Sequence, residues 1–452
     1  MRSLYFLLIL LVLPLSQYGQ TPVREGHQYF LDLFRSTDTT VHDRALAYID
    51  NNWNESFEIL GVESMYFLRH PENTLKLLFI LQKHTGKSFG YDFNQWYEYL
   101  WNKKPTYDNS YYTFKAALHQ SIDIRFAKYF LGRQDQSRIR LDEVRWGGVV
   151  QDGIPPLRNP EMIPANKARY LEDDNIVFGI SINGDTRAYP KRILAWHEMF
   201  TDTVGNTPVA GVYCTLCGTV ILYKTQYRDT SYQFGTSGFL YRSNKLMYDQ
   251  ATQTLWNTLW GTPVLGPLAQ TDVQLEYLSV VTTTWSEWKK LHPETTVLSL
   301  QTGHQRDYGE GVAYRDYFST DALMFNVPKT DRSLKNKQEI LAIRLPQETD
   351  ENIAISSKFL RKHRIYKGEI HGKQFTVFTD KSGAHRVYIT GNTNFVDYDK
   401  FQTAKDANGT KWQLTENGII NTRTSAVLPL LPTHNAFWFG YKAAFPETKL
   451  IK

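Results

Sequence analysis

The chain has 452 residues, 42% of them hydrophobic, and this length is sufficient for two or three domains with cores of their own. The net charge of +5 is small and spread along the chain, which argues against a protein that binds nucleic acid. With only 2 cysteines, at most one disulfide can form, so disulfides do not hold this fold together.

Residues 1–20 are predicted to be an export signal. Arg2 provides a positive charge, and the apolar run of residues 4–15 has the length of a signal-peptide core, too short to cross a bilayer comfortably. Ser16 and Gly19 are small residues near a suitable cleavage point. No second long apolar run follows, so we expect an exported protein, periplasmic or extracellular, with no membrane span.

Residues 21–140 are predicted to form a helical domain. Apolar residues recur at spacings of three and four in residues 27–34, 45–49 and 75–81, the pattern of amphipathic helices. Short polar joints between these segments favour packed helical hairpins. The region contains no cluster of catalytic residue types, so we expect it to dock a protein partner or to cover the rest of the chain.

A loop rich in glycine and proline, residues 146–164, marks the change to a second domain. We expect this domain to be rich in β-structure and to span residues 141–335. The dipeptide Asn183-Gly184 predicts a hairpin turn. Pro190 then favours the start of a helix, because proline is tolerated in a first turn, and we expect the helix to end near Asp202.

The two cysteines, Cys214 and Cys217, lie in a C-x-x-C-G motif between strands predicted at residues 208–213 and 219–223. This spacing lets both sulfurs face one ion, and Gly218 permits the tight turn. Since there is no second cysteine pair, a metal would take its other ligands from other residue types and leave an open site. We therefore hypothesise a bound transition metal ion: zinc, copper or iron.

His197 is the best third ligand, because it lies at the end of the predicted helix that precedes the cysteine strand. Glu198 and Asp202 are four residues apart and would share a face of that helix, so we expect them to contact the ligands or to act in catalysis by transferring protons. The order His-Glu-x-x-x-Asp lacks the second histidine of zinc proteases. His304 is a weaker candidate, and a histidine hydrogen-bonded in the core is the alternative for His197.

Two other interpretations of the cysteine pair stay open. The pair could be a redox dithiol, although a thioredoxin-like motif opens a helix and residues 219–223 have a β-type sequence. Export to an oxidising compartment favours this interpretation. Alternatively, a structural disulfide could sit in an extracellular binding module or scaffold. The sequence does not decide whether the protein is an enzyme.

A second dense stretch, residues 234–249, is predicted to line a pocket for an unidentified small ligand. Its G-x-S-G pattern differs from the G-x-S-x-G of a nucleophile elbow, and its flanks do not predict a strand followed by a helix. Ordinary hydrogen bonding within a hairpin is the alternative. The pocket residues proposed here are Gly235, Ser237, Gly238, Ser243, Asn244, Tyr248 and Asp249.

Residues 336–452 are predicted to be a degenerate second copy of the β-rich unit. Residues 285–297 resemble 438–450, and residues 188–197 resemble 354–363 at a constant offset. Chance matching of short aromatic motifs is the alternative explanation. The predicted fold is therefore α+β: a helical N-terminal domain followed by a β-rich region of two pseudo-repeats, of which only the first carries cysteines.

Several motifs, taken in their order along the chain, resemble the prokaryotic family called domain of unknown function 3179. The resemblance is strong over residues 145–345 and looser beyond. It implies that His197, Glu198, Asp202, Cys214 and Cys217 stand where the family has the same residues, whereas Thr201 and Thr215 replace its usual asparagine and proline. The family has no established activity, so the resemblance implies membership and no mechanism. The motifs are D-G-I-P at 152–155, N-G-x-x-R-A-Y-P at 183–190, W-H-E at 196–198, Y-C-x-L-C-G-T at 213–219, F-G-x-S-G at 234–238 and M-Y-D at 247–249.

Overall fold

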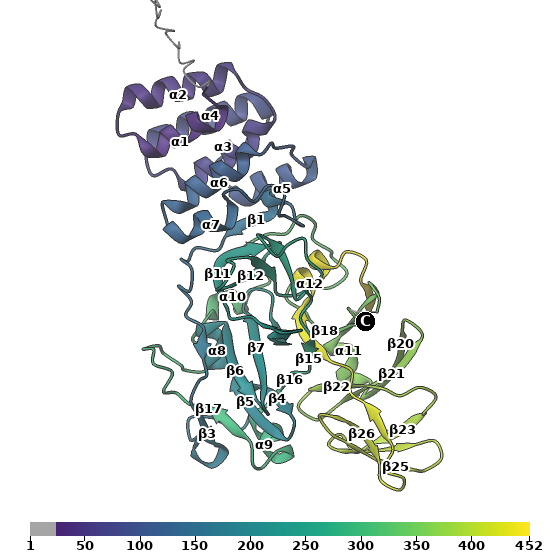
Figure 1. Cartoon of the computed structure of the whole chain (residues 1–452). Helices are drawn as coiled ribbons and strands as arrows, with labels where there is room; N and C mark the ends of the chain where they lie inside the picture. Colours follow the sequence, from purple (N-terminus) through teal and green to yellow (C-terminus); the bar gives the residue numbers. More distant parts are fainter. Residues whose placement is uncertain (1–23, 347) are drawn as a thin grey trace, which may run out of the picture.

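The computed structural model describes residues 24–346 and 348–452. Figure 1 shows a group of helices at one end of the molecule and the β-rich part at the other. The predicted export signal, residues 1–20, lies outside the described residues. Among the residues that are described, no helix is long and apolar enough to cross a membrane.

The helical part packs directly on the strands that follow it. Asp38 and Asp92 accept backbone hydrogen bonds at the starts of the second and fifth helices, and Gly86 ends the fourth in a left-handed conformation. The helical core continues into Phe239 and Tyr248 of the β-rich part. The helices are α1 (Gly26–Arg35), α2 (Thr39–Asn51), α3 (Ser56–Phe67), α4 (Pro71–Thr85), α5 (Phe93–Lys103), α6 (Ser110–Gln120) and α7 (Ala127–Phe130), with 3-10 turns at Ile124–Phe126 and Leu141–Glu143.

The first group of strands forms the sheets that carry the cysteine motif. One sheet has the order β16-β4-β5-β17-β3, a second β15-β8-β7-β6-β2, and a third β1-β11-β12-β13-β14. The strands are β1 (Val144–Trp146), β2 (Leu157–Arg158), β3 (Met162–Pro164), β4 (Ile176–Ile182), β5 (Asp185–Pro190), β6 (Met199–Val204), β7 (Thr207–Cys214), β8 (Thr219–Lys224), β9 (Gln226–Tyr227), β10 (Thr230–Ser231), β11 (Phe234–Tyr241), β12 (Asn244–Asp249), β13 (Leu255–Asn257), β14 (Thr262–Leu265), β15 (Tyr277–Leu278), β16 (Val281–Thr284) and β17 (Thr296–Leu298). The helices among them are α8 (Lys191–His197), α9 (Trp285–Leu291) and α10 (Arg315–Ser319), with a 3-10 turn at Ala165–Lys167.

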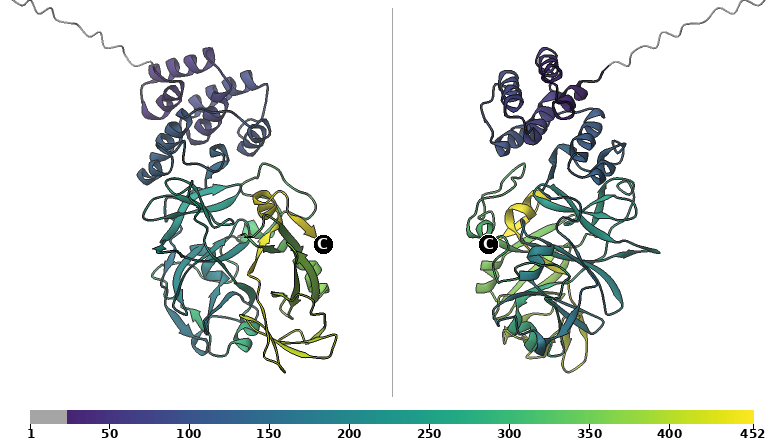
Figure 2. Two further views of the ribbon diagram at one scale, coloured as in Figure 1. Left: turned by 45° about the vertical axis from the view of Figure 1, so that its right-hand side comes forward. Right: turned by 90° about the vertical axis from the view of Figure 1, so that its left-hand side faces the viewer.

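The second group of strands lies beside the first, as the two views of Figure 2 show in green to yellow. Its sheets have the orders β28-β18-β19-β29, β20-β21-β22 and β23-β24-β25-β26-β27. The elements are β18 (Glu339–Arg344), β19 (Asn352–Ser356), α11 (Ser357–Lys362), β20 (Ile365–Ile370), β21 (Lys373–Thr379), β22 (His385–Ile389), β23 (Phe395–Tyr398), β24 (Thr403–Asp406), β25 (Lys411–Leu414), β26 (Gly418–Asn421), β27 (Val427–Pro429), β28 (Thr433–Phe437), α12 (Trp438–Ala444) and β29 (Lys449–Ile451).

The α+β class predicted from the sequence is confirmed, with helices first and a β-rich region after them. The two strand groups also share a pairing pattern. In β16-β4-β5-β17 the successive pairings are antiparallel, antiparallel and parallel. The strands β28-β18-β19-β29 pair in the same sequence of senses. In each set a helix follows the first and the third strand of that order.

Candidate functional site

The two cysteines form a disulfide in the turn between β7 and β8. Their Cα atoms are 5.5 Å apart, and Cys214 pairs with Thr219 across the two antiparallel strands. Gly218 has a φ of 56°, and a Cβ added there would come within 2.7 Å of the Phe437 ring, so both backbone conformation and space require glycine. The predicted arrangement of strand, turn and strand is confirmed.

The disulfide is buried under segments from distant parts of the sequence. Cys214 is 2% exposed and Cys217 is fully buried. The Tyr317 hydroxyl donates to the carbonyl of Leu216 at 2.7 Å, and the Phe437 amide donates to the carbonyl of Cys217 at 2.8 Å. The segment around α10 and the junction of β28 with α12 therefore cover the turn, and a reagent reaches the sulfurs only if this cover opens.

A buried carboxylate contacts the disulfide loop from one side. Glu198 accepts hydrogen bonds from the Thr215 hydroxyl at 2.7 Å and the Tyr314 hydroxyl at 2.8 Å. Its other oxygen forms an ion pair with the ammonium of Lys245 on β12. The two charged residues are 4% and 6% exposed. The disulfide loop, a buried acid and a buried base thus form one contiguous cluster, which we call the disulfide cluster: Glu198, Cys214, Thr215, Cys217, Lys245 and Tyr314.

In the disulfide cluster, the attraction between Lys245 and Glu198 does not fully offset the effect of burial on the lysine. Burial lowers the pKa of Lys245, and the attraction of Glu198 only partly offsets that effect. Burial, followed by the charge of Glu198, raises the pKa of Tyr314. Within the described residues, the Lys245 ammonium has no partner other than Glu198. A buried acid–base pair whose cation is biased towards the neutral form is typical of sites that transfer protons.

The helix that carries His197 ends earlier than predicted. Glu198 has a φ of 56° and closes α8 directly after His197, and the chain then enters β6. The expected helix to Asp202 is therefore wrong, and Glu198 and Asp202 do not share a helical face. Asp202 lies in β6 and accepts from Tyr189 at 2.6 Å and Arg187 at 2.7 Å, which fixes two strands to each other.

His197 is held by hydrogen bonds away from the cysteines. Its Nδ1 is 2.8 Å from the Pro155 carbonyl, and its Nε2 is 2.6 Å from the Tyr308 hydroxyl. Burial lowers its pKa to about 4, so the ring is neutral at pH 7. The exposed His304 ring lies 5.2 Å from the His197 ring. In the part of the chain that is described, no three His, Cys, Asp or Glu residues are grouped to hold a metal.

The remaining pocket residues from the sequence fall into separate groups. Ser237 donates to the Leu246 carbonyl at 2.6 Å, and Gly238 beside it has a φ of 84°, so both shape the irregular β11–β12 pairing. The G-x-S-G pattern lies within strand β11. Ser237 is thus a structural residue in this arrangement.

Asp152, which begins the D-G-I-P motif but is not among the predicted site residues, organises another group. The Tyr248 hydroxyl donates to its carboxylate at 2.7 Å, and Gly235 leaves room for that carboxylate, since an added Cβ would lie 2.5 Å from it. Asp249 accepts from the Trp256 indole at 3.1 Å. These contacts hold hairpins together.

Ser243 and Asn244 lie nearest to the cysteines. The sulfur of Cys217 is 3.8 Å from the Ser243 carbonyl oxygen. The Ser243 hydroxyl and the Asn244 amide nitrogen are buried without a hydrogen-bond partner among the described residues. They lie just before Lys245, so the β11–β12 turn contributes both backbone contact and unpaired polar groups to this side of the disulfide cluster.

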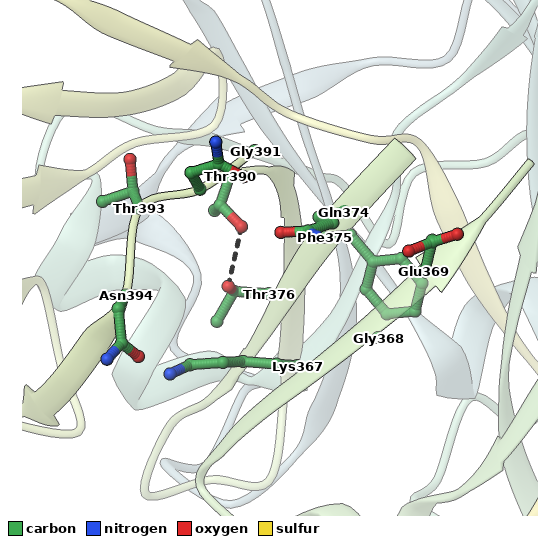
Figure 3. Close-up of a pocket in the computed structure, with 11 residues that line it drawn as sticks. Lys367, Gly368, Glu369, Gln374, Phe375, Thr376, Thr390, Gly391, Thr393 and Asn394 are labelled. Atoms are coloured by element: carbon green, nitrogen blue, oxygen red, sulfur yellow. Dashed lines mark hydrogen bonds between the residues drawn. The ribbon is translucent and has the colours of Figure 1, made fainter. Parts of the chain in front are cut away.

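A separate hollow of about 410 Å³ lies in the second strand group between β20, β21 and the loop after β22. Figure 3 shows its lining, including the Thr376 and Thr390 hydroxyls, which are 2.9 Å apart. Its charged side chains, Lys367 and Glu369, are exposed. The hollow presents no buried charge, and its two buried hydroxyls are hydrogen-bonded to each other, so we place the candidate site at the disulfide cluster.

Sequence reasoning missed Lys245, Thr215 and Tyr314 as members of the site. Lys245 did leave a signal, since it is a charged residue directly before the run Leu246–Tyr248 in the stretch predicted to line a pocket. Thr215 was visible only as a departure from the resembled family. Tyr314 left none, because its role depends on a loop that returns to the site from 116 residues further along the chain.

The family entitled "Protein of unknown function (DUF3179)" matches residues 151–448. The chain belongs to this family. The match extends through the second strand group, further than the strong resemblance at residues 145–345, and it contains the whole disulfide cluster. The helical part lies outside the matched region. No curated protein and no solved structure gives a significant match.

Proposed function

We propose that the disulfide cluster is a thiol–disulfide redox centre in which Glu198 and Lys245 manage the protons. The observation that carries the proposal is the buried Lys245–Glu198 pair, hydrogen-bonded through Thr215 into the loop that the disulfide closes. Reduction of a buried disulfide needs protons at the place where thiolates form, and this pair stands beside that place.

The reaction balances with an external dithiol as the reductant. Once the cover over the turn opens, a thiolate of the dithiol attacks one sulfur and the Cys214–Cys217 bond breaks. The departing cysteine thiolate takes a proton from the Lys245–Glu198 pair, which regains it from solvent. The second thiolate of the dithiol then attacks the mixed disulfide and releases the other cysteine, which takes its proton from solvent. Two electrons pass from the dithiol to the cysteine pair, and the dithiol leaves as a disulfide.

Loop length supports a redox role over a purely structural one. In the chain-entropy account, closing a 15-residue loop contributes about 3 kcal/mol to stability, and shorter loops contribute less. Cys214 and Cys217 are separated by 3 positions, so their bond constrains the unfolded chain very little. Purely structural disulfides gain most where they close long loops.

The test is the reduction potential of the intact chain, measured by alkylation and mass spectrometry across dithiol buffers. We expect reversible two-electron behaviour at a potential above about −300 mV, the region of reactive rather than structural disulfides. Glu198→Gln should change the pH dependence of the reduction rate. Glu63→Gln is the matched control, because Glu63 is a buried carboxylate paired with Lys115 in the helical part. Reduction only on unfolding would overturn the proposal.

The metal-binding hypothesis applies to the reduced pair alone, since a disulfide sulfur is not a thiolate ligand. Elemental analysis of reduced protein beside a Cys214→Ser/Cys217→Ser variant tests it. Export to the periplasm or beyond, and docking of a protein partner by the helical part, stay predictions as well. N-terminal sequencing of the mature protein, recovered from its native compartment, tests the predicted export.

We also propose that the two strand groups arose by duplication of one unit. The shared pairing pattern of β16-β4-β5-β17 and β28-β18-β19-β29 supports this. So does a shared contact: the Trp256 indole donates to Asp249 at 3.1 Å, and the Trp412 indole donates to Asp406 at 3.0 Å. An experimental structure in which these strands fail to superpose in chain order would refute the duplication.

A further inference from the structure

One edge of the second strand group is open to a further strand. The sheet β20-β21-β22 ends at β20, whose residues 365–370 pair with residues 373–378 of β21 and with no other strand among the described residues. Two residues of β20, Lys367 and Glu369, are charged and exposed. In Figure 1, β20 lies on the side of the second strand group that is turned away from the first. The edge of a sheet carries unpaired backbone N–H and C=O groups, which can bind another strand.

The unpaired backbone groups of β20 belong to its odd-numbered residues. Arg364, which directly precedes the strand, accepts from the Thr379 amide at 2.9 Å. Even-numbered positions therefore bond to β21, and the odd-numbered positions between them point the other way. Gln374, which lies opposite Glu369, shows the same alternation, because its carbonyl accepts from the Thr390 amide on the far side of β21. The backbone groups of the two charged residues thus face outward, without a partner among the described residues.

Most of the usual devices that protect an edge strand are absent from β20. Edge strands are commonly blocked by a proline, a bulge or charged side chains. β20 contains no proline, and its register to β21 has no shift. The nearby strand β23 pairs with β24, and its Phe395 packs on Phe378 of β21, with ring centres 5.2 Å apart. Only the charges of Lys367 and Glu369 oppose the addition of a second strand.

Neither of these charges is neutralised within the chain. Lys367 and Glu369 form no ion pair among the described residues, whereas the next lysine along the hairpin, Lys373, pairs with Glu348. Side chains two residues apart in a strand point to the same face, so β20 presents a positive and a negative group side by side. A strand with the reverse order of charges would neutralise both, and an antiparallel copy of β20 has that order.

Charge selects one register for two antiparallel copies of β20. The outward backbone groups form hydrogen bonds only if odd-numbered residues face odd-numbered residues. Two such registers place Lys367 or Glu369 opposite itself, and like charges directly opposite each other are destabilising. With Gly368 on the twofold axis, each Lys367 faces the partner's Glu369, so both pairs attract and exchange backbone hydrogen bonds. Registers that are shifted further leave part of the strand unpaired.

We propose that the chain forms a twofold-symmetric dimer in which β20 pairs with β20 of a second copy in this register. The two three-stranded sheets then become one continuous sheet. Such an interface is self-complementary, as a twofold dimer requires. Exposed ion pairs contribute little free energy, so they set the register, while the backbone hydrogen bonds supply the affinity. The dimer is independent of the redox role proposed for the disulfide cluster.

Sedimentation equilibrium of the full chain between about 1 µM and 1 mM, the range of weak complexes, tests the proposal. We expect a reversible equilibrium between monomer and dimer. Lys367→Glu and Glu369→Lys each place like charges opposite each other in both pairs, and each should weaken dimerisation at least tenfold. Lys411→Glu, the matched control at an exposed position of β25, should change it less than threefold.

A mixture of the two single variants separates this register from a general effect of charge. The Lys367→Glu chain and the Glu369→Lys chain carry opposite charges along β20, so they should bind each other at least tenfold more tightly than either binds itself. The double variant Lys367→Glu/Glu369→Lys should dimerise as the wild type does, because both pairs are reversed together. A wild-type chain that stays monomeric would overturn the proposal, as would a dimer that neither single variant weakens or a mixture that does not associate.

Discussion

The turn between β7 and β8 and the turn between β21 and β22 each join the second and third strands that follow a helix, α8 in one case and α11 in the other, but different interactions close them. The first is closed by the disulfide and flanked by the Lys245–Glu198 pair. The second is closed by Asp380, which accepts from the Ala384 amide at 3.0 Å and pairs with Arg386. Both place charges in the core, so burial alone does not distinguish them.

The difference lies in how the charges are compensated. Burial would raise the pKa of Glu416 and lower that of Arg386, yet their mutual attraction prevails: the pKa of Glu416 falls to about 2 and that of Arg386 rises. At Lys245 burial prevails and the pKa falls. A network that keeps its charges fixed serves structure, whereas one that leaves a proton easily exchanged is suited to chemistry.

Removal of the cation from the disulfide cluster should give the largest effect. Lys245→Met leaves Glu198 buried without its counter-charge, and we expect a loss of about 3–5 kcal/mol in the free energy of unfolding. Urea denaturation measures it. The double variant Lys245→Met/Glu198→Gln should recover most of the loss. A single variant as stable as the wild type would mean that the pair is not buried as described.

Acid should weaken the charge network around the second turn. The pKa of Glu416 is about 2, below its ordinary value of 4.5. Its contribution is therefore present above about pH 4.5 and lost as the pH falls towards 2; a shift of this size corresponds to about 3 kcal/mol. Urea denaturation between pH 5 and 2 follows the loss. In Glu416→Gln the dependence should flatten, and an unchanged slope would contradict the assignment.

Loss of the disulfide should matter less for stability than for reactivity. For Cys214→Ser/Cys217→Ser we expect a decrease in the free energy of unfolding of less than about 3 kcal/mol, because the closed loop is so short. Thermal denaturation with and without a reductant provides the comparison. A collapse of the fold on reduction would instead assign the bond to structure.

Substitution of Asp202 should give the smallest change in the free energy of unfolding. It also tests whether Asp202 belongs to the redox site or only stabilises the first strand group. Asp202→Asn weakens the contacts to Arg187 and Tyr189, so we expect a loss of about 1–2 kcal/mol. The reduction potential of the cysteine pair should not change. A shifted potential in this variant would bring Asp202 back into the site.

Local sequence determined much of this molecule, because its signals depend on neighbours along the chain. The amphipathic helices, the Asn183-Gly184 hairpin, the strand–turn–strand geometry of the cysteine motif and the family membership were all predicted. The prediction extended the helix to Asp202, although it ends at His197. Glu198 ends it by adopting a left-handed conformation, and the sequence gives no sign of this because Glu198 is not a glycine.

Only the tertiary structure decided which groups share a site. Lys245 on β12 meets Glu198 at the end of α8, and Phe437 covers Cys217 from the far end of the chain. Local patterns record which residues prefer a helix, a strand or a turn. They do not record which charges burial brings together, because desolvation and pairing depend on contacts between residues hundreds of positions apart.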